Sequence, residues 1–365
     1  MDESFYETFG KIIAIIFLIV IPLHFFRITI WTYFISPRIF RRGGENYITP
    51  EKDSWVIVTG ATDGIGLEFA RQLAGKGYNI CLISRNPEKL EKTRETIVKD
   101  FPGCGKVITI PFDFSSTNYD SLTQSINKLP RIDILINNVG VVPNGSSLPN
   151  YFTSIPRAKI LQGININIFA CTYLTSLALC RMRSQIGGPN MIINVSSIFG
   201  CFVKPLYTLY CSTKVFMNFF SRSLRFECFE ENVDVHCLNT GPVATNITPT
   251  SMNFLVPGPY DYVKMVLSCI GYHSHLVGYW VHELLLWLAI WIPIFSLYPD
   301  TSDRQGTRLL ALLREQIYRY LEIPNSGCAS KDTKFDLMSA ILLVRGNPIN
   351  IGKYAGKSPA ATPRY

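Results

Sequence analysis

Short apolar runs alternate with longer stretches of helical periodicity through the middle of the chain. The apolar runs predict buried strands at residues 55–58, 79–84, 106–112, 132–136, 189–195 and 233–238. The stretches between them predict helices. One follows the first strand and ends near residue 75, and the others cover residues 87–99, 119–129, 154–182 and 207–230. Repeated strand–helix units of this length predict the α/β class with a doubly wound parallel sheet.

Two apolar stretches lie outside this alternation. Residues 12–35 are nearly all hydrophobic and long enough for a transmembrane anchor or a hairpin-like membrane segment, although Arg27 favours a position near the interface or a segment that enters and returns. Arg38, Arg41 and Arg42 follow it, which places the C-terminal bulk in the cytosol by the positive-inside rule. Residues 276–297 are also apolar. They contain His282 and Glu283, so we favour an interfacial or lid element over a second span.

Composition agrees with lipid contact and argues against a nucleic-acid partner. Of the 365 residues, 47% are hydrophobic and 17% are charged, which is more apolar than is usual for a soluble enzyme. The net charge of +8 comes without a basic block interleaved with aromatic residues, so we expect no nucleic-acid partner. The ten cysteines form no Cys-x-x-Cys pair, and His273 and His275 have no supporting ligand nearby. We therefore expect reduced thiols and no metal site.

A glycine-rich turn follows the first predicted strand. Gly60, Gly64 and Gly66 lie between that strand and a helix, where the backbone can approach a pyrophosphate at the helix N-terminus. At the end of the second predicted strand, Arg85 suits the 2′-phosphate of NADPH, the alternative being an ordinary surface arginine. Asp113 follows the third strand, where a carboxylate could meet the adenine. This pattern predicts an NADPH site.

A tyrosine and a lysine share one face of the helix predicted at residues 207–230. Tyr210 and Lys214 are four residues apart, so the ammonium can favour the ionised form of the phenol and make Tyr210 a proton donor. Such a pair is common on solvated helix faces. It gains weight from Asn137-Asn138-Val139-Gly140, from Asn167 and from Ser196-Ser197, which we expect to form one active site with it.

These motifs, in this order, resemble the short-chain dehydrogenase/reductase family over residues 55–245. Further likeness, in the membrane segment and in the run Gly278-Tyr279-Trp280-Val281-His282, points to the branch of very-long-chain 3-oxoacyl-CoA reductases and 17-beta-hydroxysteroid dehydrogenases types 3 and 12. The resemblance implies a Rossmann-type fold. It also implies a cofactor site of Gly60, Thr62, Asp63, Gly64, Ile65, Gly66, Arg85, Asp113, Asn138, Gly140, Tyr210, Lys214, Pro242, Val243 and Thr245.

The resemblance also implies catalytic roles. Tyr210 would protonate the substrate carbonyl, Lys214 would lower the pKa of Tyr210 and hold the nicotinamide ribose, Ser197 would bind the carbonyl, and Asn167 would anchor a water. Ser197 is preferred to Ser196, and Asn167 to Asn165, by motif alignment alone.

We expect a membrane anchor with its basic flank (1–42), a linker (43–54), an NADP-binding catalytic domain (55–250) and a substrate lid with an apolar membrane-associated segment (251–298). A C-terminal extension of unknown role (299–365), with an amphipathic helix expected at 307–321, lies beyond the resemblance. The implied location is the endoplasmic reticulum membrane with the catalytic domain in the cytosol, although no Lys-Lys pair lies near the C-terminus.

The resemblance implies a lipophilic substrate, either a long-chain 3-oxoacyl-CoA or a steroid ketone, and the sequence leaves both open. For a CoA substrate, Lys204 and Lys264 are candidates for the mouth of the site. A catalytically silent membrane scaffold is a further alternative, against which the complete set of catalytic residues argues. A second copy of the chain and fatty-acid-elongation proteins are compatible partners.

Overall fold

The computed structural model describes residues 19, 23, 26–35, 47–143, 151–202, 204, 206–231, 233–246, 248 and 250–291. The predicted C-terminal extension (299–365) lies outside the described residues, as does most of the predicted membrane segment before Phe26.

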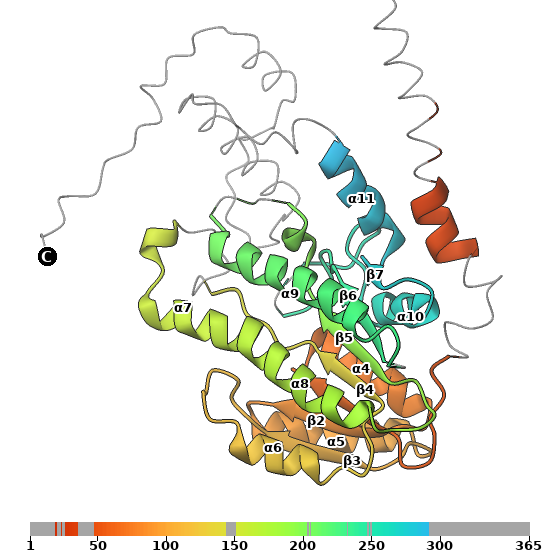
Figure 1. Cartoon of the computed structure of the whole chain (residues 1–365). Coiled ribbons are helices and arrows are strands. Elements are labelled where there is room, and N and C mark those ends of the chain that lie inside the picture. Colours follow the sequence, from red (N-terminus) through yellow and green to blue (C-terminus); the bar gives the residue numbers. More distant parts are fainter. Residues whose placement is uncertain are drawn as a thin grey trace, which may run out of the picture. The chain divides into compact units, whose positions relative to one another are not determined.

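A parallel sheet forms the centre of the described part of the chain (Figure 1). Its strands lie in the order β3-β2-β1-β4-β5-β6-β7, and every neighbouring pair is parallel. The strands are β1 (Trp55–Thr59), β2 (Asn79–Ser84), β3 (Val107–Pro111), β4 (Ile134–Asn137), β5 (Met191–Val195), β6 (Asp234–Leu238) and β7 (His275–Leu276). The predicted doubly wound sheet is confirmed, because each apolar run that was expected as a strand is one.

β7 is the strand that the sequence pattern did not predict. It has two residues, of which His275 is exposed, so it has no apolar run of its own. Backbone hydrogen bonds from Cys237 N to Ser274 O and from Asn239 N to Leu276 O hold it beside β6, both at 2.8 Å. The sheet therefore extends beyond residue 250, the predicted end of the catalytic domain.

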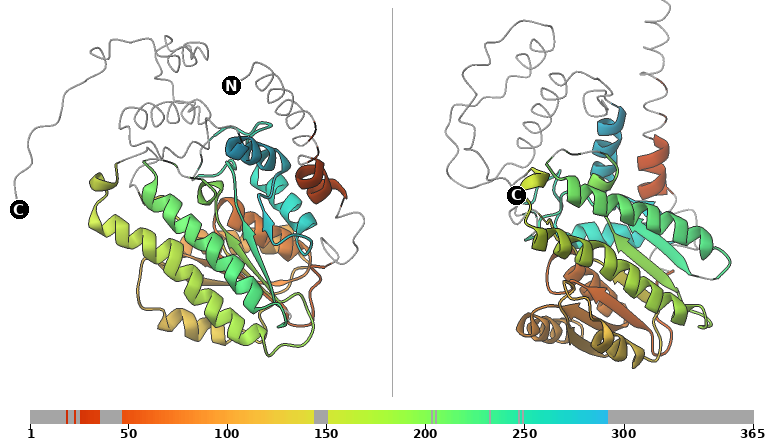
Figure 2. Two further views of the ribbon diagram at one scale, coloured as in Figure 1. Left: turned by 45° about the horizontal axis from the view of Figure 1, so that its top comes forward. Right: turned by 60° about the vertical axis from the view of Figure 1, so that its left-hand side comes forward.

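Helices cover both faces of the sheet and bury alternate residues of its strands (Figures 1 and 2). α4 (Gly64–Gly75), α5 (Pro87–Asp100) and α10 (Pro259–Cys269) pack on the face that includes Val56 and Val58. α6 (Asp120–Asn127), α8 (Ala170–Met182) and α9 (Thr208–Glu227) pack on the face that includes Trp55 and Ile57. Two apolar cores result, one on each side of the sheet.

The helix predicted at residues 154–182 is an uninterrupted helical run with a change of winding. It begins after the short 3₁₀ turn η4 (Phe152–Ser154) and comprises α7 (Arg157–Ile164), the π-helical turn η5 (Asn165–Phe169) and α8. Among the described residues, Arg157–Met182 is the one helix whose length and hydropathy would allow it to cross a bilayer. Half of its most apolar window is buried inside the domain, as expected for a core helix.

The described end of the predicted membrane segment is docked on the domain. Residues Phe26–Ile35 form the π-helix η2, which packs against α10 and α11 (Trp280–Trp291). The hydroxyl of Tyr33 accepts a hydrogen bond from the backbone N–H of Gly278 at 3.1 Å and donates one to Glu283 at 3.2 Å. This attachment joins residues more than 240 positions apart and is not visible in the sequence pattern.

Candidate active site

The strand order reverses between β1 and β4, which is where ligands bind in open parallel sheets. The carboxyl end of β1 leads into the glycine-rich turn, and the carboxyl end of β4 leads into Asn138 and Gly140. The sequence motifs for cofactor binding therefore meet at one edge of the sheet.

Two glycines of the turn have backbone conformations that residues with a side chain rarely adopt. Gly60 has φ +64° and Gly64 has φ +53°, and a Cβ on Gly66 would lie 2.5 Å from the carbonyl oxygen of Gly60. Asp63 is the N-cap of α4 and accepts a hydrogen bond from Gly64 N at 2.8 Å. The N-terminal amides of α4, followed by Ile65 in its first turn, are thus presented at a tight turn that suits a pyrophosphate.

Asparagine side chains tie the site to the sheet. Asn138 Nδ2 donates to the carbonyl oxygens of Thr59 and Gly60 at 3.0 and 3.2 Å. Asn137 Nδ2 donates to Asn194 Oδ1 on β5 at 2.8 Å, and Asn194 Nδ2 donates to Ser221 Oγ on α9 at 2.9 Å. These bonds fix β1, β4, β5 and α9 relative to one another.

Tyr210 and Lys214 lie in the first two turns of α9, where Lys214 is buried and Tyr210 is half-buried. Lys214 Nζ donates to the carbonyl oxygen of Val195 at 2.9 Å and lies 5.7 Å from the centroid of the Tyr210 ring. A Cβ on Gly140 would be 3.6 Å from Lys214 Nζ and 3.7 Å from Asn167 Oδ1, so these groups converge.

Burial controls the protonation of both side chains. It lowers the pKa of Lys214 to about 8, and it raises the pKa of Tyr210 to about 12 against the opposing effect of a hydrogen bond with Ser197. Lys214 is not among the groups that shift the pKa of Tyr210 in this structure, so the expectation that it lowers this pKa stays a prediction. Desolvation of the phenol outweighs the other contributions, and the ammonium group is turned to Val195.

The two adjacent serines have different partners. Ser196 Oγ donates to the carbonyl oxygen of Lys214 at 3.1 Å, so its hydroxyl anchors α9. Ser197 caps the short helix η6 (Ile198–Gly200), accepting from Phe199 N at 3.2 Å, and its hydroxyl opposes the rise in the pKa of Tyr210. Ser197 is thus the serine beside the phenol.

The two asparagines of η5 are also separated by their contacts. Asn165 Nδ2 donates to the carbonyl oxygen of Ser115 at 2.9 Å. Asn167 accepts from Val141 N at 2.9 Å and donates to Val141 O and to Thr213 Oγ1 on α9. The π turn therefore places the Asn167 amide between the loop after β4 and α9, a common use of such turns at functional sites.

Arg85 and Asp113 lie at the ends of neighbouring strands and are exposed. Arg85 directly follows β2, whose last residue Ser84 hydrogen-bonds Thr62 of the glycine turn at 3.1 Å. One oxygen of Asp113 accepts from Ser115 N at 2.9 Å. Arg85 is thus the residue next to Ser84, through which β2 contacts the glycine turn.

The segment after β6 contains Pro242, Val243 and Thr245 and closes the other side of the site. A Cβ on Gly64 would come within 2.8 Å of the Thr245 methyl group, so this segment lies against the glycine turn. The sequence pattern missed His282 of α11, which lies against the same segment. A Cβ on Gly241 would be 2.5 Å from His282 Nδ1, while His282 Nε2 bonds Leu255 O at 2.8 Å.

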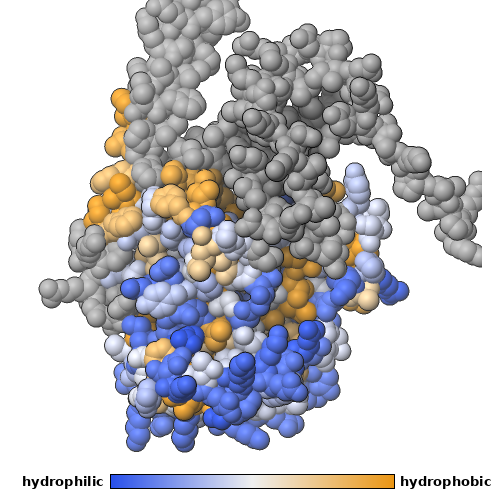
Figure 3. Space-filling view, turned by 180° about the vertical axis from the view of Figure 1, so that it is seen from behind, coloured by the Kyte–Doolittle hydropathy of each residue, from blue (hydrophilic) through white to orange (hydrophobic). Residues whose placement is uncertain are grey.

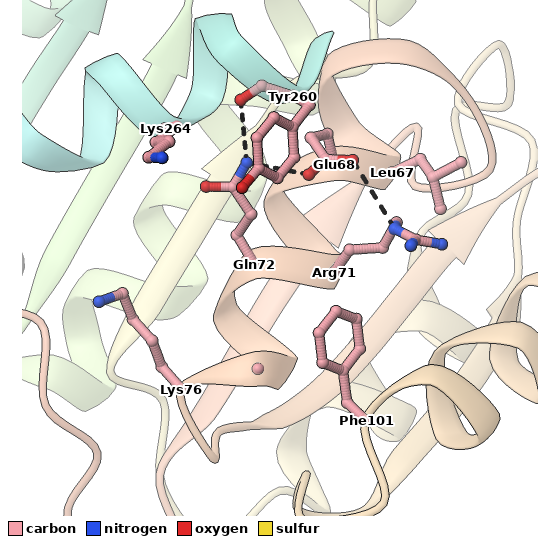
Figure 4. Close-up of a pocket in the computed structure, with 9 residues that line it drawn as sticks. Leu67, Glu68, Arg71, Gln72, Lys76, Phe101, Tyr260 and Lys264 are labelled. Atoms are coloured by element: carbon pink, nitrogen blue, oxygen red, sulfur yellow. Dashed lines mark hydrogen bonds and ion pairs between the residues drawn. The ribbon is translucent and has the colours of Figure 1, made fainter.

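The lysines proposed for a CoA-binding mouth differ from expectation. Lys204 is only 4% exposed, and its ammonium lies 4.1 Å and 4.2 Å from the ring centroids of Phe199 and Tyr207. Such a buried lysine does not stand at an open mouth. Lys264 is exposed and lines a groove of about 650 Å³ with Lys76 and Tyr260, between α4 and α10 (Figure 4). Tyr210 and Ser197 are not part of that groove.

No group of three or more potential metal ligands occurs in the described residues, and His273 and His275 are not joined there by a third. The nine cysteines that the structure describes are all free thiols.

Known proteins resemble this chain in both sequence and fold. A family model described as short chain dehydrogenase matches residues 54–254. The very-long-chain 3-oxoacyl-CoA reductase-A of Danio rerio is 35% identical over 256 residues, which cover 69% of this chain and 78% of that protein. Hydroxysteroid dehydrogenase-like protein 1 of Gallus gallus is 31% identical over 255 residues, covering 68% of this chain and 75% of that protein.

A solved short chain dehydrogenase from Shigella flexneri, complexed with NADP, has a similar fold. The TM-score is 0.53 at 21% identity, and the match covers 63% of this chain and 97% of that chain. At this identity the likeness bears on the fold alone.

Proposed function

The chain belongs to the short chain dehydrogenase family, and we propose that it is a membrane-bound, NADPH-dependent ketoreductase that reduces long-chain 3-oxoacyl-CoA in fatty-acid elongation. It is an oxidoreductase that acts at a CH–OH or carbonyl carbon. The observation that carries the proposal is the convergence of Tyr210, Ser197, Lys214 and Asn167 beside the glycine turn.

Each of these side chains has a role that follows from its contacts. Tyr210 is protonated at neutral pH, since its pKa lies well above neutrality, so it can donate a proton to the carbonyl oxygen as the carbon is reduced. Ser197, whose hydroxyl acts on the pKa of Tyr210, orients that oxygen. Lys214 holds the ribose and stabilises the phenolate that proton donation leaves. Asn167, fixed by Val141 and Thr213, supports a water that resupplies the proton.

NADPH would supply the hydride. The turn of Gly60, Gly64 and Gly66 suits its pyrophosphate, Thr62, Asp63 and Ile65 line that turn, and Asn138 and Gly140 border the ribose. Arg85, exposed next to the glycine turn, is the side chain that favours a 2′-phosphate. Asp113 would meet the adenine, and Pro242, Val243 and Thr245 would close over the nicotinamide.

The names of the relatives support an acyl-CoA substrate first and a steroid second. The Danio rerio relative is named a very-long-chain 3-oxoacyl-CoA reductase, whereas the Gallus gallus relative is named hydroxysteroid dehydrogenase-like. A steroid ketone therefore remains the second candidate substrate. The membrane segment predicted at residues 12–35 supports attachment to the endoplasmic reticulum with the catalytic domain in the cytosol, where elongation partners or a second copy could bind.

The direct test offers both substrates to the detergent-solubilised full chain. NADPH oxidation is measured with a long-chain 3-oxoacyl-CoA and with a 17-ketosteroid at matched concentration. We expect preference for the acyl-CoA. Preference for the steroid would mean that the substrate is a steroid ketone. NADPH binding without NADPH oxidation in the presence of either ketone would mean that the chain is a catalytically silent scaffold.

A further inference from the structure

Large apolar side chains are exposed on three neighbouring elements at one end of the domain. They are Phe26, Trp31 and Phe34 of η2, Met252, Phe254 and Leu255 of the loop before α10, and Leu285 of α11. Phe254 is 64% exposed and Met252 is 72% exposed. We call this set the apolar rim. Figure 3 shows the corresponding concentration of hydrophobic surface at upper left, above a mostly hydrophilic surface.

The rim is one surface because Trp280 joins its parts. The ring of Trp280 contacts Phe34 with centroids 6.3 Å apart and Phe254 with centroids 5.5 Å apart, both edge to face. Tyr33, on the same helix as Phe34, is hydrogen-bonded to Gly278 and Glu283. Trp280 therefore links the loop that contains Phe254 to η2.

The length of the apolar sequence before η2 indicates what covers the rim. A hydrocarbon core about 30 Å thick needs about 20 apolar residues in helical form. Only 14 residues lie between Lys11 and Phe26, so the segment is too short to cross before η2 begins. A membrane segment at the predicted position would then bring η2 to the bilayer boundary. Aromatic residues such as Trp31 and Trp280 are favoured at that boundary.

The rim is also connected to the candidate active site. Leu255 O accepts from His282 Nε2 at 2.8 Å, and His282 lies against Gly241. Pro257 O accepts from Ala244 N at 3.1 Å, inside the segment that we propose closes over the nicotinamide. The loop of Met252 and Phe254 thus lies between the exposed apolar surface and the reaction centre.

We propose that the apolar rim rests on a lipid bilayer, so that the loop over the active site faces the lipid and admits an acyl chain from it. Bilayer contact by the rim is independent of the reaction, whereas the admission of an acyl chain rests on the proposed function. The loop is then a second membrane contact, in addition to the predicted anchor. It lies far from that anchor in the sequence.

Photocrosslinking of the full chain in phosphatidylcholine vesicles tests this surface. Phe254 is replaced by p-benzoylphenylalanine, and the irradiated protein is digested and examined by mass spectrometry for a phospholipid adduct. A second variant carries the crosslinker at Met252, in case the first does not fold. The matched control carries it at Ile186, which is 94% exposed and lies near the amino ends of the strands, beside Gln185 and Ile132. Vesicle flotation and thermal unfolding establish that each variant is bound and folded.

We expect a lipid adduct at positions 254 and 252 and none at 186. Vesicle-bound protein without an adduct at either rim position would overturn the proposal, as would an adduct to a second copy of the chain. Lipid adducts in a protein that does not oxidise NADPH with any offered ketone would support the membrane contact and contradict the ketoreductase activity. The two proposals can therefore fail separately.

Discussion

Lys214 Nζ donates a hydrogen bond to the carbonyl oxygen of Val195, the last residue of β5, at 2.9 Å. The bond links the helix that carries Tyr210 to the carboxyl edge of the sheet. Because the amine is buried, its pKa falls to about 8, so its charge is present at neutral pH and lost in mildly alkaline solution.

We therefore predict that reduction depends on the charge of Lys214. The ammonium form predominates below pH 8, so kcat/KM for the ketone should be highest there and should fall as pH rises through about 8. Tyr210 remains protonated over this range because its pKa is about 12. A pH–rate profile checks this. A rate that stays constant to pH 9.5, well beyond the pKa of about 8, would show that the charge is not needed. Lys214→Met should be slow at every pH.

Arg85→Asp should shift cofactor preference from NADPH toward NADH. A charge-assisted hydrogen bond to the 2′-phosphate contributes about 1.5–3 kcal/mol, which corresponds to a loss of about 10- to 160-fold in kcat/KM for NADPH. Lys89→Asp is the matched control, because Lys89 is also exposed but lies within α5. An unchanged ratio of NADPH to NADH activity in Arg85→Asp would remove the assignment of this residue.

Gly241→Ala should destabilise the protein through His282. The new Cβ would lie 2.5 Å from Nδ1, and such overpacking costs about 1–3 kcal/mol. The cost should shrink when His282 is also changed to Ala, so thermal unfolding of the four combinations should show coupling. Gly103→Ala is the control, since a Cβ there has no atom within 4 Å. If the effects of Gly241→Ala and His282→Ala were additive, contact with the His282 ring would not be the cause of the lost stability.

Asn194→Ala should lower stability by about 1–3 kcal/mol, because it leaves buried partners without their hydrogen bonds. Asn194 connects Asn137 with Ser221 and is fully buried. Asn127→Ala at the exposed end of α6 should change stability by less than about 0.5 kcal/mol. Equal denaturation midpoints for Asn194→Ala and wild type would contradict the role of this network.

The sheet and the positions of the motifs were predictable because they depend on local sequence. Buried parallel strands are continuous apolar runs, and the glycine turn and the spacing of Tyr210 and Lys214 can be seen directly. β7 was not predictable, because its two residues join the sheet only through β6. The docking of Tyr33 on Gly278 and the contact of His282 with Gly241 depend on distant segments that the pattern does not relate.

The pKa of Tyr210 shows a different limit of sequence reasoning. The spacing of Tyr210 and Lys214 places both on one helix face, from which a lowered pKa was expected. Burial has a larger effect on the phenol, and its depth follows from the packing of the whole site. The choices of Ser197 over Ser196 and of Asn167 over Asn165 came from motif alignment, and the hydrogen bonds now supply a physical reason for them.

The most direct test of the account compares wild type with Tyr210→Phe in NADPH oxidation with a long-chain 3-oxoacyl-CoA. General acid catalysis contributes about 10²- to 10⁴-fold, so the variant should lose that much in kcat while still binding NADPH. Tyr173→Phe is the control, since it also removes a hydrogen-bonded hydroxyl, 2.7 Å from Thr123 Oγ1, and should keep its activity. Turnover by Tyr210→Phe at the wild-type rate would contradict the proposed role of this tyrosine and the assignment of the site.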